Sequence, residues 1–514
     1  MNLADTLTQA AWKWPNKTAL VFEGRRWTYA EWNRLVNKAA HAFRAAGIDK
    51  GDRVAFLTYN LPEQVTGFYA LMKIGAVPVP INYRLAANEI KYIIDDSGAR
   101  ILVFEEALRA PVVAIKGDLA VEKYVYVGPN PEGAEIPFET FIAPGSDGEP
   151  AAAVDWHDPA FIMYTSGTTG RPKGVVRSHL AEIMGSMSMA LECGFRHNDI
   201  VLNNKPLFHI AQLQIQFVPF VQIGGTNVLT RGFDVDETLS LVGRERITTL
   251  HGVPTQMVMI AAADLAKYDL STLRCGFYGG QTLADDVTRK CMTMYPQYFA
   301  NIYGSTEALA VTTCDYRLHP DKLGSVGKAA VNMDVRVIRT DSGEPDDVCN
   351  VGEIGQLITR GPSVFSEYLG LPERTAAAFV QGWFCSGDAA FVDDEGFITV
   401  MGRMDHTIKS GGENIHPSEI ENLLFKHPGV ANAAAVGLPS AKWGQAVCAA
   451  IVRGDSALTA DALDQFCRSS ADLASFKRPR HYFFVDEIPA NPTGKVERGK
   501  LKELLLTRLQ APLE

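Results

Sequence analysis

The chain has 514 residues, of which 46% are hydrophobic and 21% charged, with a formal net charge of −10. This length calls for at least two domains, and the acidic balance argues against nucleic-acid binding. We expect no membrane-spanning or secretory segment, and the eight cysteines, without a C-x-x-C pair, favour reduced thiols and a cytoplasmic location.

The first hundred residues alternate between helical and extended patterns. Apolar residues recur at helical spacing from Trp32 to Ala46 and again from Phe68 to Ile74. A third helix is predicted over 87–96, and the strands are predicted at 54–57, 77–81 and 101–104. This alternation predicts a parallel α/β sheet with helices on its faces. We expect the Pro-, Gly- and acid-rich stretch Gly128–Glu149 to be a long surface connection.

The segment Phe161–Gly174 places hydroxyls, glycines and Lys173 directly behind an apolar run. We interpret the run as a buried strand, followed by a loop whose hydroxyls and backbone N–H groups surround phosphate oxygens. It is not a Walker P-loop, because that motif places a Ser or Thr after the lysine, where this chain has Gly174.

The predicted secondary-structure pattern changes twice in the C-terminal part. Short strands and turns from Leu357 to Val400 predict a β-rich subdomain, with a hairpin turn at Asp393–Gly396. After Arg403 we expect a small α+β module. Its predicted elements are a helix over 418–426 and strands at 433–436, 447–452 and 482–485. The expected domains are therefore residues 1–403 and 404–514.

Further polar patches follow the phosphate segment in a definite order. They are Tyr303–Glu307, Trp383–Asp388, Gly402–Arg403, Lys409–Asn414 and Pro492–Lys495. Together with Thr165–Gly174 they resemble the motifs of the adenylate-forming superfamily, which includes acyl-CoA synthetases, aryl-CoA ligases, luciferases and peptide-synthetase adenylation domains. The resemblance covers nearly the whole chain. It implies a large N-terminal body of stacked mixed and parallel sheets with helices and a β-rich subdomain, and a small α+β C-terminal domain on a hinge.

The resemblance also implies roles for individual residues. ATP binding falls to Thr165, Ser166, Gly167, Thr168, Thr169, Lys173, Gly280, Gln281, Tyr303, Gly304, Thr306, Asp388 and Arg403. Lys495 is the implied catalytic lysine between the substrate carboxylate and the α-phosphate, and Glu307 the implied Mg²⁺ ligand. Asp405 is the implied hinge, and Gly411 and Gly412 are expected beside coenzyme A. The stretch Tyr278–Thr282 lacks the Ala-Pro of the family's adenine turn, so only a backbone contact is expected of Gln281.

The implied reaction joins a carboxylic acid to coenzyme A. The acid attacks the α-phosphate of ATP to form acyl-AMP and pyrophosphate, and the thiol then displaces AMP. Lysine, Mg²⁺ and oriented amides are needed because two anions meet in the first step. The implied partners are therefore a small-molecule acid, ATP and coenzyme A. A homodimer is an open alternative to a monomer.

The segment after Phe208 bears on which acid is used. His209 resembles the His beside the carboxylate pocket of acyl- and aryl-CoA ligases, where amino-acid-activating domains place an Asp. Phe233–Asp234 lies about 25 residues too late for that Asp, so we expect Asp234 to cap a helix. Gln212, Gln214 and Gln216 either face the pocket or point elsewhere. A hydrophobic fatty or alicyclic acid is favoured, with an aryl acid nearly equal. A carrier-protein-charging adenylation domain, a luciferase-like oxygenase and a non-catalytic binding protein are the weaker alternatives.

Overall fold

The computed structural model describes residues 2–165, 171–280, 283–470, 473–490 and 496–509. The chain divides into two compact units. Unit 1 comprises residues 1–282, 287–335 and 359–384, and unit 2 comprises 283–286, 336–358 and 385–514. We describe each unit by itself. The predicted boundary at 403/404 remains a prediction.

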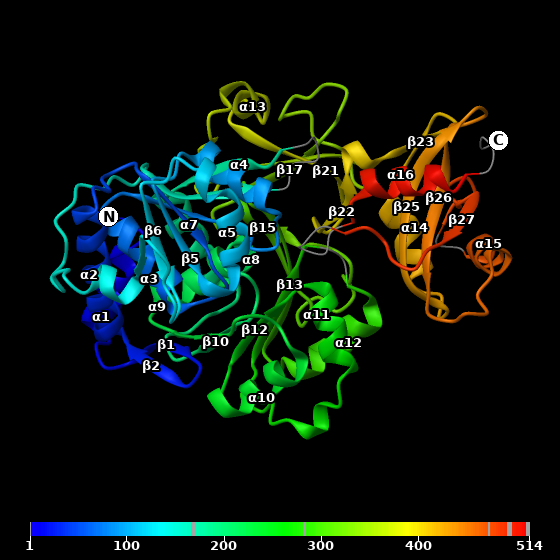
Figure 1. Ribbon diagram of the computed structural model, residues 1–514. Coiled ribbons are helices and arrows are strands. Elements are labelled where there is room, and N and C mark those ends of the chain that lie inside the picture. The colour runs from blue at the N-terminus through cyan, green and yellow to red at the C-terminus, as the bar shows by residue number, and fades with distance from the viewer. Residues whose placement is uncertain (1, 166–170, 281–282, 471–472, 491–495, 510–514) are drawn as a thin grey trace. The chain divides into compact units, whose positions relative to one another are not determined.

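The largest sheet among the described residues has nine strands and belongs to unit 1. Its order is β16 (Lys328–Ala329), β15 (Leu309–Asp315), β14 (Tyr298–Ser305), β13 (Cys275–Gly279), β12 (Thr249–Gly252), β10 (Ile200–Asn203), β11 (Thr226–Leu229), β1 (Thr18–Phe22) and β2 (Arg25–Thr28). The strands from β14 to β1 are parallel, while both edges are antiparallel. Figure 1 shows α10 (Val235–Glu245), α11 (Pro254–Ala262) and α12 (Asp285–Met294) grouped beside β12 and β13.

A second sheet of unit 1 is parallel throughout its described pairs. Its order is β4 (Val77–Pro80), β3 (Arg53–Leu57), β5 (Ile101–Glu105), β6 (Lys123–Val127) and β7 (Glu135–Pro137). The helices near it in sequence are α1 (Asp5–Lys13), α2 (Tyr29–Ala45), α3 (Pro62–Lys73), α4 (Ala87–Ser97), α5 (Arg109–Ile115) and α6 (Phe138–Ile142). The predicted helices and strands of the first hundred residues are confirmed.

The prediction that 128–149 is only a surface connection is wrong. The stretch forms β7 and α6, and Phe138, Phe141 and Ile142 are buried. The rings of Phe141 and Phe43 pack edge to face with centroids 5.0 Å apart. At the end of the stretch, the carboxylate of Glu149 pairs with the buried ammonium of Lys73 at 2.5 Å. Composition suggested a loop, but its few aromatic and aliphatic residues are enough to tie it to the core.

A small antiparallel sheet of unit 1 carries the segment predicted to hold phosphate. β8 (Pro159–Thr165) pairs with β9 (Lys173–Ser178), and β9 pairs with β19 (Glu367–Tyr368). Phe161 packs edge to face on Phe68 of α3, with centroids 5.7 Å apart. The predicted buried strand is thus confirmed. The remaining described α- and π-helices of unit 1 are α7 (His179–Glu192), α8 (Ile210–Gln212), η3 (Leu213–Phe217), α9 (Val218–Ile223) and α13 (Pro372–Ala377).

Strands continue between residues 334 and 403. The sheet order is β17 (Asp334–Ile338), β18 (Gly355–Arg360), β21 (Trp383–Val392) and β20 (Phe379–Val380), with β22 (Ile398–Arg403) paired to β21. The predicted hairpin turn joins β21 to β22, and the carboxylate of Asp393 accepts from the backbone N–H groups of Glu395 and Phe397. The β-rich region is confirmed.

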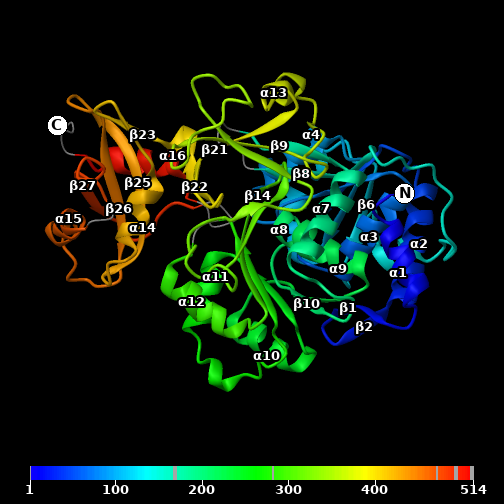
Figure 2. The ribbon, with the colours of Figure 1, turned by 180° about the vertical axis from the view of Figure 1, so that it is seen from behind.

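The predicted α+β module forms within unit 2. Its sheet order is β24 (Glu413–Ile415), β23 (Ile408–Ser410), β26 (Gly444–Arg453) and β25 (Val430–Ser440), with β27 (His481–Phe484) parallel to β26. Its helices are α14 (Pro417–Leu424), α15 (Ala460–Ser469) and α16 (Arg498–Thr507). Figure 2 shows α14 and α16 against this sheet. Both helices contact β25, and their apolar residues complete its core.

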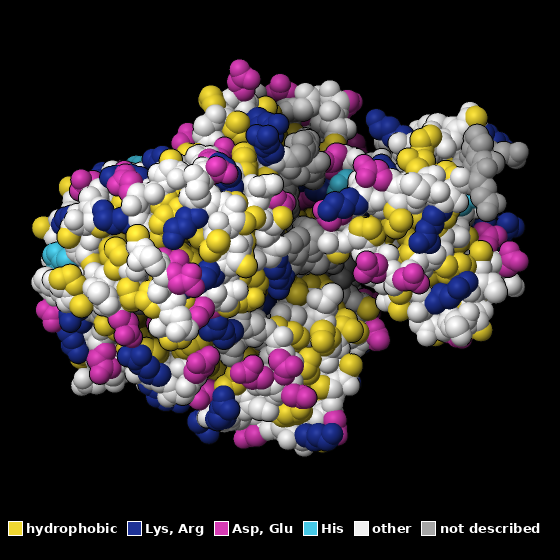
Figure 3. All heavy atoms as spheres, viewed as in Figure 1, with side chains coloured by type: hydrophobic (Ala, Val, Ile, Leu, Met, Phe, Trp, Pro, Cys, Tyr) yellow, Lys and Arg dark blue, Asp and Glu magenta, His cyan; other side chains and the backbone are white. Residues whose placement is uncertain are grey.

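The surface of the described residues carries mixed charge. Figure 3 shows Lys and Arg side chains interspersed with Asp and Glu over the face turned to the viewer. Within the described ranges, the helices are too short or too polar to traverse a lipid bilayer.

Candidate active site

Thr165, Lys173 and Tyr368 lie on the small sheet of unit 1, and Glu307 contacts it from the β14–β15 turn. Thr165 and Lys173 are register partners at the ends of β8 and β9. The ammonium of Lys173 lies 4.8 Å from the ring centroid of Tyr368, on β19 beside β9. The hydroxyl of Tyr368 donates to Oε1 of Glu307 at 2.9 Å. The predicted phosphate lysine and metal carboxylate therefore share one neighbour.

Tyr303, Gly304, Thr306 and Glu307 lie at the end of β14 and in its turn to β15. A Cβ at Gly304 would lie 1.6 Å from the carbonyl oxygen of Leu309, so the close approach of these strands requires glycine. Leu309 itself has φ +55°, a left-handed conformation that costs a bulky residue about 1 kcal/mol or more. Contacts on both sides hold this strained turn, which presents the carboxylate of Glu307.

Arg177 holds the backbone of the same turn through hydrogen bonds. Its guanidinium donates from Nη1 to the carbonyls of Thr306 (3.1 Å) and Glu307 (3.3 Å), and from Nη2 to that of Ser363 (2.9 Å). Its Nε donates to the carboxylate of Glu182 on α7, and both side chains are fully buried. Burial raises the pKa of Glu182, and the guanidinium opposes that rise.

His209 stands at the start of the helical stretch formed by α8 and η3. Its Nδ1 accepts from the backbone N–H of Ala211 at 3.2 Å, so the ring caps the stretch. The neighbouring His251 stacks on Phe277 with centroids 4.6 Å apart. The buried ammonium of Lys205 donates to the carbonyl of His251 at 2.6 Å. Burial lowers the pKa of Lys205 to about 7, and burial with the charges of Lys205 and His209 lowers that of His251.

The three glutamines after His209 are all buried and hydrogen-bonded to the protein. Gln212 donates to Asn203 and to Gln216 (2.9 Å), and Gln216 donates to the carbonyl of Leu202 at 3.2 Å. Gln214 points to α7 instead, where its amide donates to Oε1 of Glu182 at 2.9 Å. The π-helical turn η3 makes room for this arrangement, which the α-helical period does not predict.

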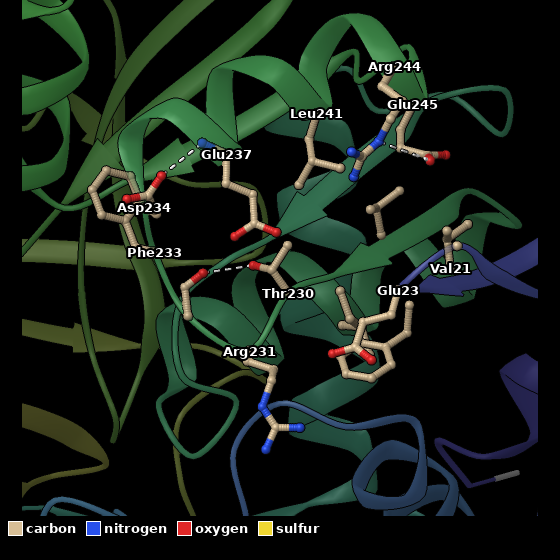
Figure 4. Close-up of a pocket in the computed structure, with 15 residues that line it drawn as sticks. Val21, Glu23, Thr230, Arg231, Phe233, Asp234, Glu237, Leu241, Arg244 and Glu245 are labelled. Atoms are coloured by element: carbon tan, nitrogen blue, oxygen red, sulfur yellow. Dashed lines mark hydrogen bonds and ion pairs between the residues drawn. The ribbon is translucent and has the colours of Figure 1, made fainter.

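Asp234 caps a helix, as predicted. Its side chain accepts from the backbone N–H of Glu237 at 2.8 Å, at the start of α10 (Figure 4). It borders a cavity of about 310 Å³ between the ends of β1 and β11 and helix α10. Among the described residues, none of those predicted for the site lines this cavity.

Asp388 and Arg403 lie together in unit 2 as register partners on β21 and β22. Nη1 of Arg403 lies 3.7 Å from Oδ1 of Asp388 and donates to the carbonyl of Ser386 at 2.6 Å. Gly387 has φ +72°, and a Cβ there would lie 2.7 Å from Nη2 of Arg403. Asp405 follows in the turn 404–406, with Oδ1 3.5 Å from Nε of Arg403. The predicted ribose pair and the predicted hinge are thus neighbours.

Gly411 and Gly412 form the turn of the β23–β24 hairpin. Their φ angles are +61° and +88°, as two-residue turns of type I′ require. The N–H of Gly411 donates to the carbonyl of Trp443 at 2.9 Å. The hairpin accounts for both glycines structurally, and their contact with coenzyme A stays a prediction.

The remaining predicted site residues divide between two cases. Gly280 is described and has φ +94°, which suits a backbone turn after β13. Ser166, Gly167, Thr168, Thr169, Gln281 and Lys495 lie outside the described residues.

Sequence reasoning missed Tyr368, Arg177 and Lys205. Tyr368 sits in a two-residue strand far along the chain from Glu307, so spacing gave no signal. Arg177 follows the phosphate segment by three residues, and a cation directly after the apolar pair Val175–Val176 was the available signal; Lys205 lies three residues before Phe208 and gave no comparable signal.

Comparison with known proteins identifies the family. Residues 7–369 match the AMP-binding enzyme family, and residues 419–495 match the AMP-binding enzyme C-terminal domain. A feruloyl-CoA synthase from Amycolatopsis sp is 36% identical over 491 residues, covering 95% of this chain and 96% of its own. A long-chain-fatty-acid–CoA ligase from Mycobacterium tuberculosis is 35% identical over 488 residues, covering 93% of each.

Comparison with solved structures supports the same family. An anthranilate CoA ligase in complex with anthranoyl-AMP superposes with a TM-score of 0.90 at 27% identity, covering 99% of this chain and 98% of its own. ATP-bound MatB from Rhodopseudomonas palustris superposes with a TM-score of 0.88 at 28% identity, covering 98% and 99%. The chain therefore belongs to the AMP-binding enzyme family of adenylate-forming ligases and is an AMP-forming acid–CoA ligase.

Proposed function

We propose that this ligase activates a hydrophobic carboxylic acid, fatty or alicyclic, as acyl-AMP and transfers the acyl group to coenzyme A. The observation that carries this proposal is the environment of His209. Leu213, Ile215 and Phe217 are buried and apolar, and the NH₂ groups of the interleaved glutamines donate to protein groups. We infer that the acyl chain binds beside this stretch, where apolar surroundings suit an apolar chain better than a polar one.

The same environment disfavours amino acids. Lys205, four residues before His209, donates from its buried side chain to the carbonyl of His251. The carboxylate that contacts this helical stretch, Glu182, is already bonded to Arg177 and Gln214, so a substrate ammonium would lack a carboxylate partner, which is costly in an apolar pocket. Asp234, the other carboxylate considered as a partner for a substrate ammonium, caps α10 instead.

An aryl acid is the second candidate. It is favoured by the aromatic pair of His251 and Phe277, stacked with an interplanar angle of 10°. Feruloyl-CoA synthase, indoleacetate–CoA ligase from Aromatoleum aromaticum and the anthranilate CoA ligase are named for aromatic acids, and the M. tuberculosis relative for long-chain fatty acids. A fatty acid–[acyl-carrier-protein] ligase from Streptomyces coeruleorubidus keeps a carrier protein as an alternative acceptor.

We assign the roles of individual residues within this proposal. Thr165 and Lys173 bind the β- and γ-phosphates with Ser166–Thr169, Tyr303 stacks on adenine, and Asp388 and Arg403 hold the ribose. Lys495 bridges the substrate carboxylate and the α-phosphate, and residues 411–412 lie along coenzyme A. Movement about Asp405 brings Lys495 in for the first step and takes it away for the second.

Glu307 fits the proposed role of Mg²⁺ ligand. Its Oε1 accepts from Tyr368, and within the described ranges its Oε2 has no hydrogen-bond partner, which suits it to a hard cation. Bound Mg²⁺ would neutralise phosphate charge. The chain itself supplies the strained β14–β15 turn, which fixes where the carboxylate stands.

The test is an AMP-release screen with ATP, Mg²⁺ and coenzyme A over acids of graded length and aromaticity. Each acid is paired with its 2-amino derivative as the matched control. We expect the plain acid to exceed its amino derivative by at least about 10²-fold in kcat/KM. Preference for any free amino acid contradicts the proposal, a best substrate with an aryl ring selects the second candidate, and light emission would indicate an oxygenase.

A further inference from the structure

A buried polar chain joins the turn of the candidate metal carboxylate to the helical stretch after His209. It begins at the carbonyls of Thr306 and Glu307, which accept from Arg177. It continues from Arg177 to Glu182, and Gln214 donates to the same carboxylate oxygen of Glu182 at 2.9 Å. Gln214 lies in η3, five residues after His209.

A contribution to stability alone does not account for this buried polar chain. Arg177, Glu182 and Gln214 are each fully buried, and taking an ion pair out of water costs more than packing apolar residues of the same volume. Oε2 of Glu182 and Oε1 of Gln214 have no hydrogen-bond partner in the described part of the chain. Each such buried atom has lost its hydrogen bonds to water without a replacement, which destabilises the fold further. An expensive arrangement that stabilises little points to a role in placing other groups.

The group it places is the β14–β15 turn. The guanidinium is planar and offers several donors in a fixed geometry, so it sets the carbonyls of Thr306, Glu307 and Ser363 relative to one another. The carbonyl of Glu307 also accepts from the N–H of Phe365 at 2.6 Å. With its backbone held from two sides and its Oε1 held by Tyr368, the carboxylate of Glu307 has little freedom left.

We propose that Arg177 is a positioning residue for the carboxylate of Glu307, and that Glu182 and Gln214 hold Arg177 in place and tie it to the acid-pocket helix. The inference rests on the proposed metal role of Glu307. The proposal has a specific consequence. Loss of the Arg177–Glu182–Gln214 hydrogen bonds weakens the contribution of Mg²⁺ to ATP binding and leaves the contribution of the nucleotide itself unchanged.

The test compares ATP binding with Mg²⁺ and with EDTA, by calorimetry on the full chain without an acid. The ratio of the two dissociation constants is the Mg²⁺ advantage. The first variant is Arg177→Met/Glu182→Leu, which removes both buried charges together because removing one would strand the other. We expect its Mg²⁺ advantage to fall at least about fivefold, a change of roughly 1 kcal/mol, while ATP affinity in EDTA stays within about twofold.

The matched control is Arg274→Met/Asp199→Leu. Arg274 and Asp199 form another buried Arg–carboxylate pair of unit 1, and Arg274 also donates to the carbonyl of Gly194 at 2.9 Å. This pair does not touch the β14–β15 turn in the described contacts. We expect its Mg²⁺ advantage to match the wild type. An equal fall in both double variants would assign the effect to general loosening and overturn the proposal.

A milder pair of variants keeps the test decisive if the double variant does not fold. Gln214→Leu removes the amide that bonds Glu182, whereas Gln216→Leu removes one that bonds the carbonyl of Leu202. We expect Gln214→Leu alone to lower the Mg²⁺ advantage, by about twofold or more. An unchanged ratio in Gln214→Leu, or the same change in Gln216→Leu, overturns the link to the helix.

The wild type separates this inference from the proposed function. If wild-type ATP binding gains nothing from Mg²⁺, the metal role itself fails. If the wild type shows the advantage and folded Arg177→Met/Glu182→Leu retains it within about twofold, the metal role stands and the positioning role of Arg177 is wrong.

Discussion

At the scale of single residues, several buried polar groups of this enzyme are costly. Lys205 is the clearest example, because its ammonium is buried and bonded only to neutral oxygens of Asn204 (3.3 Å) and His251 (2.6 Å) among the described residues. Burial lowers its pKa from 10.5 to about 7. The unfolded chain keeps this proton up to about pH 10.5, whereas the folded protein releases it above about pH 7.

This difference predicts a pH dependence of stability. Between about pH 7 and pH 10.5 the unfolded state binds more protons than the folded state, so this lysine makes stability rise with pH across that window. Below it the buried charge carries its full cost. Lys205→Met should therefore stabilise the protein more at about pH 6.5 than at about pH 9, by on the order of 2 kcal/mol.

The measurement is the shift of thermal midpoint between variant and wild type at the two pH values. Groups remote from Lys205 titrate alike in both proteins and cancel in the difference. Lys500→Met is the matched control, because Lys500 is an exposed lysine paired with Glu497. A shift that does not change with pH would mean that Lys205 stays charged in the folded protein.

At the scale of elements, periodicity predicted the N-terminal helices and strands because each buries one regular face. Helix α2, for example, buries Trp32, Val36, Ala39 and Phe43 and starts with the capping box of Thr28 and Glu31. The prediction for 128–149 was wrong because its apolar residues are too few to form a periodic pattern, although Phe138 and Phe141 are buried.

The candidate site was predictable to a different degree. Motif residues such as Lys173 and Glu307 could be recognised, since each lies in a short segment of distinctive residues. Their neighbour Tyr368 could not, because the three residues belong to distant parts of the chain that come together only in the folded protein. The glutamines were ambiguous because η3 departs from the α-helical period.

One element-scale prediction separates capping from substrate recognition at Asp234. Asp234→Ala leaves the first turn of α10 without its side-chain acceptor, which should cost about 1 kcal/mol and lower the thermal midpoint by roughly 2 °C. Asp234→Asn should restore the cap, since Asn caps as well as Asp. Acid preference in the AMP-release assay should stay unchanged in both variants. A loss of activity on amino-derivatised acids in Asp234→Asn would show that the carboxylate takes part in recognition.

At the scale of the whole molecule, the proposed reaction requires residues of both units. The candidate phosphate and metal groups belong to unit 1, while Asp388, Arg403 and Asp405 belong to unit 2. In the proposed reaction, the lysine that serves adenylation leaves room for the thiol by moving with its domain. Asp405, in the turn 404–406 between β22 and β23, is the proposed pivot.

Asp405→Pro tests this pivot because proline fixes φ near −65°. We expect it to hold the enzyme in the state poised for adenylation, so that acyl-AMP forms at a near-normal rate and accumulates while transfer to coenzyme A becomes limiting. Single-turnover measurements of acyl-AMP and thioester in one preparation give both rates, and circular dichroism checks the fold. Asp405→Ala is the control, since it removes the side chain that lies 3.5 Å from Nε of Arg403 but leaves the backbone free to rotate. If both variants slow both steps equally, the side chain matters and not the backbone; if neither slows thioester formation, the pivot lies elsewhere in the chain.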